Sequence, residues 1–332
     1  MKRWLAITGV VLFIAGCQSL AYYTQAIGGH LRVLAKARPV EDWLADPATP
    51  PELKARLQTA RRIREFASNE LKLPDNKSYL AYADLERPFV VWNVFAAPEL
   101  SVEPKAECFP FTGCVSYRGF YAEDDARRYA EKLRAQGYDV YVGGVPAYST
   151  LGWSDDPLLS TFIRYTDSQL ARLLFHELAH QVAYAKNDTT FNESFAVAVE
   201  EEGVKRWLRA EGRSAELADF QAAQVRKREL AQRVAQARER LALVYRSSLS
   251  REEMLEQKRG EWARLRASYP AIPAEPNNAF LASIAVYTEL VPAFERLLAQ
   301  SGSFEQFYDD VKQLAKSGKR DIDDLLVRRP GT

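Results

Sequence analysis

The fold of the second half of the chain follows from residues 166–182, which read TDSQLARLLFHELAHQV. Thr166 and Gln169 stand three positions apart and match the capping box that begins a helix. The apolar residues behind them recur at helical spacing: Leu170, Leu173, Leu174, Leu178 and Val182. The stretch therefore predicts an amphipathic helix whose apolar face packs on a core.

The same helix carries an H-E-x-x-H motif. His176 and His180 fall one turn apart on one face, with Cβ atoms about 5–6 Å apart, which suits two imidazoles meeting one zinc ion. Glu177 stands beside the first histidine, where it can act as general base and then carry the proton to a leaving amine. The chain has only 3 His, so this spacing is informative. A structural histidine pair is the alternative interpretation.

Catalytic zinc needs a third protein ligand, and Glu193 is the best candidate. It follows the loop 186–190 and opens a second helix, which can fold back and bring its first turn beside the imidazoles. The alternative is that Glu193 only favours the helix N-terminus electrostatically. Asp188 is a weaker competitor, Glu200 could support the ligands, and His30 is expected at the surface or at a helix cap.

Outward from this motif the chain divides into regions of different character. Residues 20–73 are helical in pattern, with a helix predicted from Thr49-Pro50-Pro51-Glu52, a capping box with proline at the first helical position, to about Leu71. Residues 78–145 form a small α+β sheet region. Its predicted strands are Phe89–Phe95, Gly113–Phe120 and Tyr138–Val142, with a helix from about Ala122 to Ala135.

From about Pro157 onward the pattern is entirely helical. A long antiparallel hairpin is predicted over about 205–268, breaking near Tyr245–Ser250, and two more helices end the chain. Ser250 and Glu253 match a capping box that begins the second helix of the hairpin. Its charges are those of a solvated face, or alternatively of an arm that binds a protein partner. The predicted fold class is thus α+β and mostly helical, in which 17–156 and 157–332 form one continuous catalytic unit.

The N-terminus has the features of an export signal. Lys2 and Arg3 precede an apolar run, and the segment ends at Cys17 in a sequence that resembles the bacterial lipobox. We expect residues 1–16 to be a lipoprotein signal peptide and Cys17 to be lipidated, which anchors the protein to a membrane. Gln18 and Ser19 follow the cysteine, which favours the outer membrane, facing the periplasm. The alternatives are a plain secretory signal and an N-terminal membrane anchor.

Cys108 and Cys114 are the other two cysteines, six positions apart. An oxidising compartment permits a disulfide between them, and the turn residues of the intervening loop would let the ends meet. Two free buried thiols or a metal pair are the alternatives. The composition is otherwise that of a globular protein: 45 Lys+Arg balance 44 Asp+Glu, which lacks the basic excess of a nucleic-acid-binding protein.

The combination of H-E-x-x-H with a downstream glutamate resembles the Glu-zincin metallopeptidases. More narrowly, the chain is similar to the zinc aminopeptidase family of bacterial lipoproteins. The similarity rests on the lipobox, on the metal motif and on three further segments: 117–121 (YRGFY), 141–153 (YVGGVPAYSTLGW) and 277–279 (NNA). It implies a zincin-like helical half, one zinc ion and a peptide substrate.

The resemblance also directs attention to tyrosines, because Glu-zincins often stabilise the oxyanion with a side chain outside the motif. Tyr287 and Tyr148 are the candidates, with simple packing as the alternative for both. The strand that includes Tyr117 and Arg118 could pair with an extended peptide, and Arg118 could bind a substrate carboxylate or form a salt bridge. An Asn-Glu group is present at Asn192, whereas the amine-binding Gly-x-Met-Glu-Asn segment of one large aminopeptidase class is absent.

The sequence therefore predicts a lipid-anchored zinc aminopeptidase. A zinc endopeptidase of the cell envelope remains open, as does a non-catalytic scaffold or chaperone-like lipoprotein that works through its helical hairpin.

Overall fold

The computed structural model describes residues 22–109, 113–269, 272 and 276–317. The expected signal peptide (1–16) and Cys17 lie outside these residues. None of the described helices is both long and apolar enough to cross a membrane.

Three helical segments precede the main sheet. Residues 22–36 are helical, and α2 (Val40–Ala45) and α3 (Pro51–Asn69) follow. The predicted capping box at the start of α3 is wrong, because Pro50 takes the N-cap position and no side chain caps the helix. Pro51 fixes the first helical residue through its locked φ, and its missing N–H removes one donor that a cap would satisfy. The Thr49 hydroxyl is buried without a hydrogen-bond partner among the described residues.

The main sheet is antiparallel, with strand order β6-β3-β7. Its strands are β3 (Val91–Pro98), β6 (Tyr117–Phe120) and β7 (Tyr138–Val145). Helix α4 (Glu123–Ala135) packs on one face, over Trp92, Val94 and Phe120. The other face meets α9 (Asn278–Ala285) through Phe95 and Ala97. Because both faces are covered, β3 is a nearly continuous buried run rather than an alternating one.

Two smaller sheets complete the first half. One joins β1 (Arg38–Pro39), β2 (Ala81–Ala83) and β8 (Leu158–Leu159). The other is the hairpin of β4 (Glu107–Phe109) and β5 (Gly113–Val115). Two predictions are corrected here: the expected strand over 113–120 is split at Ser116 between two sheets, and the chain after 157 is not entirely helical, because the fully buried Leu158 and Leu159 pair with β2.

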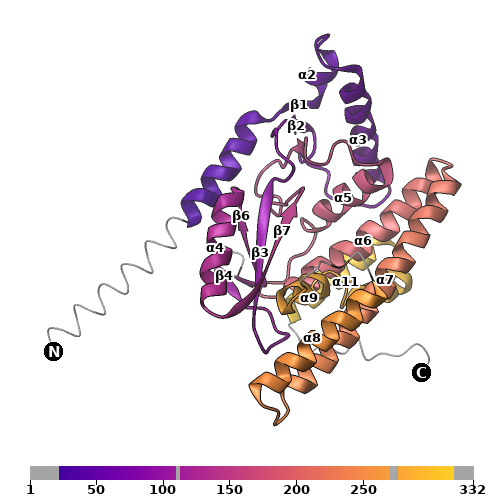
Figure 1. Ribbon diagram of the computed structural model, residues 1–332. Coiled ribbons are helices and arrows are strands. Elements are labelled where there is room, and N and C mark those ends of the chain that lie inside the picture. The colour runs from indigo at the N-terminus through magenta and orange to yellow at the C-terminus, as the bar shows by residue number, and fades with distance from the viewer. Residues whose placement is uncertain (1–21, 110–112, 270–271, 273–275, 318–332) are drawn as a thin grey trace.

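The second half is built from helices, and the mostly helical α+β class is confirmed (Figure 1). The helices are α5 (Asp167–Ala179), α6 (Thr189–Ala210), α7 (Ser214–Tyr245), α8 (Arg251–Ser268), α9 (Asn278–Ala285), α10 (Val291–Ser301) and α11 (Phe304–Ser317). The predicted capping boxes form at Thr166 and at Ser250. In the part of the chain that the structure describes, three helices follow the hairpin rather than two, since residues 286–290 separate α9 from α10.

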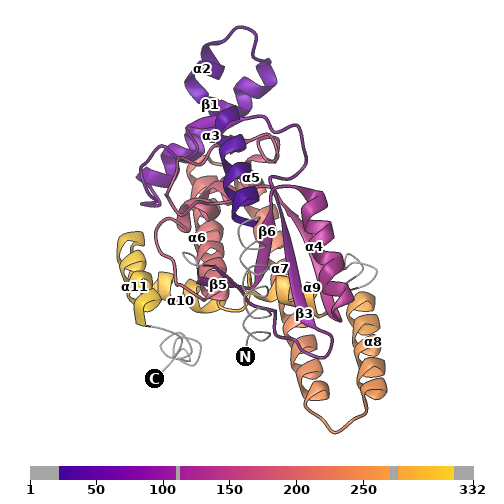
Figure 2. The ribbon, with the colours of Figure 1, turned by 90° about the vertical axis from the view of Figure 1, so that its left-hand side faces the viewer.

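The long hairpin of α7 and α8 projects from the body of the molecule (Figure 2). It breaks at 246–249, as the sequence predicts, but it begins at Ser214 rather than near 205. The earlier residues belong to α6, which ends before Gly212, a glycine with φ of 68°. A left-handed glycine at this place is the usual stop signal of a helix.

Helices α5 and α6 pack against each other in the largest apolar core. Gly203 of α6 allows the close approach, since a Cβ there would lie 2.7 Å from both Phe175 of α5 and Leu71. This close packing brings polar side chains of α5 and α6 within contact distance of one another.

Candidate metal centre

The two motif histidines lie at the C-terminal end of α5. The chain stays helical in φ and ψ at His180, the residue after α5 ends, and its backbone N–H donates to the His176 carbonyl. The two Nε2 atoms are 3.2 Å apart, and the ring planes are nearly perpendicular, at 88°. Both imidazoles are largely buried. The helix thus directs two nitrogen donors at one point.

Glu193 reaches the same point from α6. Its Oε2 lies 3.2 Å from Nε2 of His176 and 3.6 Å from Nε2 of His180. Among the described residues, these three form the one group of at least three His, Cys, Asp or Glu side chains that could hold a metal ion. The sequence-predicted ligands are therefore brought together.

The connection between α5 and α6 is short and closed by side chains. Asp188 does not join the ligands; its carboxylate accepts from the Phe191 N–H and caps α6. Asn192 closes the loop on itself, because its side-chain amide exchanges two hydrogen bonds with the backbone of Ala185, at 2.7 and 2.9 Å. These contacts fix where α6 begins, and hence the position of Glu193 in its second turn.

A buried carboxylate orients the first histidine. Glu200 lies two turns after Glu193 on α6, and its Oε2 is 2.9 Å from Nδ1 of His176. A proton on Nδ1 donates to this carboxylate, which leaves the Nε2 lone pair free for a metal. The other oxygen of Glu200 pairs with Arg172 at 3.1 Å and lies 3.7 Å from Lys227 of α7. The base of the hairpin therefore contributes to the surroundings of the site.

The charges at the site are strongly coupled. Burial alone would raise the pKa of Glu193, but the imidazoles of His180 and His176 outweigh it and bring the pKa to about 2. Burial alone would lower the pKa of His176, but hydrogen bonds with Glu193 and Glu200 raise it to about 10. At neutral pH and without a metal, the imidazole of His176 is therefore protonated between the carboxylates of Glu193 and Glu200. A metal ion that displaces a proton from His176 is attracted by the negative charge of the same two carboxylates.

Glu177 lines the cavity in front of the three ligand side chains. Only 7% of the residue is exposed, and burial raises the pKa of its carboxyl above the usual value, although the two histidines partly oppose this. A carboxylate whose basicity is increased in this way is suited to accept a proton.

The cavity beside the site has a volume of about 400 Å³. Apart from the two histidines and two glutamates of the site, its described walls carry no formally charged side chain. Seven aromatic residues contribute to it: Tyr22, Tyr23, Phe109, Tyr117, Tyr148, Tyr184 and Tyr287. The walls are thus apolar surfaces with hydroxyl groups at intervals.

The structure separates the remaining candidate residues. Tyr287 lies beside His176, with ring centroids 6.4 Å apart, whereas the Tyr148 hydroxyl is 2.7 Å from Nδ1 of His30. His30 therefore forms a hydrogen bond with Tyr148 in the cavity wall and does not belong to the group of metal ligands. Tyr117 lines the cavity, but the neighbouring Arg118 does not. Its guanidinium lies 4.1 Å from the Tyr22 ring centroid and forms a salt bridge of 3.7 Å, with Glu107.

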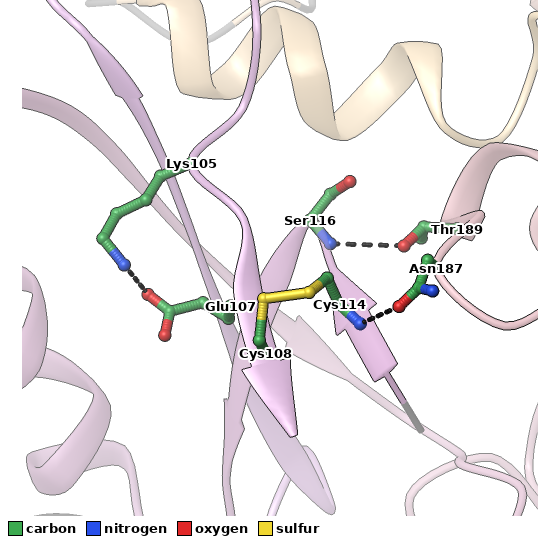
Figure 3. Close-up of a disulfide and its surroundings, with 7 residues drawn as sticks. All are labelled: Lys105, Glu107, Cys108, Cys114, Ser116, Asn187 and Thr189. Atoms are coloured by element: carbon green, nitrogen blue, oxygen red, sulfur yellow. Dashed lines mark hydrogen bonds and ion pairs between the residues drawn. A yellow bond between two sulfur atoms is a disulfide. The ribbon is translucent and has the colours of Figure 1, made fainter. Parts of the chain in front are cut away.

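The predicted pair Cys108 and Cys114 is joined as a disulfide across the β4–β5 hairpin. Figure 3 shows this disulfide beside the loop that leads into α6. The hairpin also contributes to the cavity through Phe109 and Val115.

Sequence reasoning missed three contributors. Arg172 stands four positions before His176, so helical spacing could have revealed it as a neighbour of the site. The loop clip made by Asn192 and the approach of Lys227 from another helix depend on tertiary packing. No local sequence pattern predicts such contacts.

Comparison with known proteins identifies a family for the chain. No curated protein and no solved structure matches the chain. One family, described as "Putative aminopeptidase", matches residues 21–326, which is nearly the whole sequence. The match includes the described helices that carry the histidines and Glu193, and the chain therefore belongs to the putative aminopeptidase family.

Proposed function

We propose that the protein is a zinc peptidase, and specifically an aminopeptidase. The observation that carries the proposal is the triangle of donor atoms on His176, His180 and Glu193, which stands in a cavity next to the buried Glu177. Membership of the family supports peptide hydrolysis as the reaction.

The donor set fits zinc. Two imidazole nitrogens and one carboxylate are a usual protein ligand set for a catalytic zinc ion. Donor atoms about 2.0–2.1 Å from a tetrahedral ion lie about 3.3–3.4 Å from one another. The three distances here are 3.2, 3.2 and 3.6 Å. Calcium and magnesium take sets of oxygen ligands, which two imidazoles do not supply.

His176, His180 and Glu193 would hold the zinc ion, and the chemistry supplied there would be Lewis-acid polarisation of the scissile carbonyl and a lowered pKa of a water molecule. Glu177 accepts the proton of the attacking water and passes it to the leaving amine. Glu200 holds the proton on Nδ1 of His176, which keeps Nε2 available as a ligand. We assign the donor to the developing oxyanion to Tyr287, since the Tyr148 hydroxyl is already engaged by His30.

The walls of the cavity favour a class of substrate. Aromatic rings and uncharged groups can bury an apolar or aromatic side chain of the peptide. Away from the three ligand side chains and Glu177, the described walls carry no charged group, so a charged side chain of the substrate would lose its hydration there without gaining a counter-ion, which is costly. We therefore propose peptides with apolar residues beside the cleaved bond.

The location and the partners follow from the sequence features. We propose a lipoprotein anchored through Cys17, in the cell envelope and facing the periplasm from the outer membrane. Its contacts would be a peptide substrate, the membrane through the lipid, and a protein partner on the helical hairpin. Radiolabelled palmitate incorporated into the full chain, and lost in Cys17→Ala, tests the anchor.

The test of the reaction is the Glu177→Gln variant of the purified protein. It should retain one zinc ion per chain, measured by mass spectrometry of the metal, and lose peptide hydrolysis. Wild-type protein that binds no zinc would favour the scaffold function, and full activity of the variant would exclude Glu177 as the base. Hydrolysis of an amine-blocked peptide as fast as its free counterpart would indicate an endopeptidase instead of an aminopeptidase.

A further inference from the structure

The disulfide-closed hairpin of β4 and β5 lies directly on the loop that delivers Glu193 (Figure 3). Two backbone amides of the segment donate to side chains of that loop. The Cys114 N–H donates to Oδ1 of Asn187 at 2.7 Å, and the Ser116 N–H donates to Oγ1 of Thr189 at 3.2 Å. Hairpin and loop are 73 residues apart in sequence, so these contacts are tertiary.

The hairpin also fits the loop sterically. Gly113 has φ of 78°, and a Cβ on it would lie 2.3 Å from Oδ1 of Asn187 and 2.7 Å from Cγ of Lys186. Only a residue without a side chain allows this approach. The backbone of the hairpin therefore lies directly against the side chains of Lys186 and Asn187.

Asn187 needs this support because its backbone is in the left-handed region, with φ of 69°. Asparagine tolerates that conformation better than most residues, but it persists where surrounding contacts hold it. The next residue, Asp188, caps α6, and Glu193 lies five residues further along. The turn at Asn187 thus sets the start of the helix that carries the third ligand.

The disulfide gives the hairpin its own rigidity. Each strand has three residues, and the two form a separate two-stranded sheet. A two-stranded hairpin of this size is marginally stable without further constraint. The bond between Cys108 and Cys114 closes it across the directly paired residues. Loss of the bond would leave Asn187 facing a loosely ordered partner.

We infer that Cys108, Cys114 and Asn187 are positioning residues for the metal site: the closed hairpin holds the 186–189 loop so that Glu193 meets the two histidines. The inference rests on the proposed metal site and not on peptide hydrolysis. It predicts that loss of the disulfide weakens metal binding while α5, which carries the histidines, remains intact. The contacts between the hairpin and the 186–189 loop do not involve α5.

Two variants of the full chain test it. Cys108→Ser with Cys114→Ser removes the disulfide, and Asn187→Gly removes the acceptor while it permits the left-handed backbone. Lys105→Met is the matched control, because it removes the Lys105–Glu107 ion pair of the same hairpin and touches no residue of the loop (Figure 3). Zinc affinity is measured by competition with a chromophoric chelator, the Co²⁺ absorption spectrum reports the ligand set, and the thermal midpoint of the metal-free protein reports folding.

Loss of a contact that orients a metal ligand commonly weakens affinity roughly 10–100-fold. We expect a loss in this range for both variants, with a changed Co²⁺ spectrum, and wild-type affinity for Lys105→Met. Wild-type affinity and spectrum in Asn187→Gly would overturn the inference even if the double cysteine variant does not fold. Absence of metal binding by the wild-type protein would instead refute the metal site itself.

Discussion

Replacing Glu200 with Gln separates the orientation of His176 from general stability. The glutamine oxygen can still accept the proton on Nδ1, but the negative charge that faces His176, Arg172 and Lys227 is lost. Substitutions of such supporting groups typically weaken metal affinity roughly 10–100-fold, or about 1.4–2.7 kcal/mol. Arg172 and Lys227 are partly exposed, and the loss of their shared carboxylate partner also lowers the free energy of unfolding.

Glu201→Gln is the matched control. The two carboxylates are adjacent on α6 and equally buried, with side chains 2% and 3% exposed. Glu201 pairs with Lys227 and Arg228, and the carboxylates that bond to His176 are those of Glu193 and Glu200. Both variants should lower the free energy of unfolding, measured with urea, but only Glu200→Gln should weaken zinc binding in a chelator competition. Equal zinc affinity in the two variants would refute the role assigned to Glu200.

Three further predictions concern other parts of the account. Tyr287→Phe should lower kcat roughly 10²-fold with zinc content unchanged, since it removes a proposed oxyanion donor; an unchanged kcat would exclude that role. Gly203→Ala should destabilise the protein by about 1–3 kcal/mol in urea unfolding, because its Cβ would meet Phe175 and Leu71 at 2.7 Å, and wild-type stability would contradict this packing. The pKa of His176 is raised to about 10 without metal, so zinc binding at pH 7 should release about one proton and should tighten as pH rises. Calorimetry in buffers of different ionisation enthalpy checks this, and a heat independent of the buffer would contradict it.

The parts of the fold that sequence predicted are those with local causes. The capping boxes at Thr166 and Ser250 act within a few residues and appear as expected. The apolar stripe of α5 is buried from Leu170 to Leu178, whereas Val182 lies beyond the end of the helix and is only partly buried. The capping box at Thr49 failed because a second proline moved the N-cap by one residue. The two-residue strand β8 could not be predicted, since its cause is pairing with a strand 76 positions earlier (Tyr82 with Leu158, Ala83 with Leu159).

The candidate site shows the same division. His176 and His180 follow from a single helix turn, and Glu193 follows from one short connection. Lys227 arrives on a different helix, and the contact of Cys114 with Asn187 joins segments 73 residues apart. Such residues can be identified only from the tertiary structure, because neither hydrophobic periodicity nor motif spacing predicts a contact between segments that are distant in sequence.

The most direct test of the central claim is a crystal structure of the full chain grown with zinc. The account predicts one ion within about 2.0–2.2 Å of Nε2 of His176, Nε2 of His180 and a carboxylate oxygen of Glu193, with a fourth position open to the cavity. A zinc-soaked crystal in which these three side chains hold no common ion would contradict it.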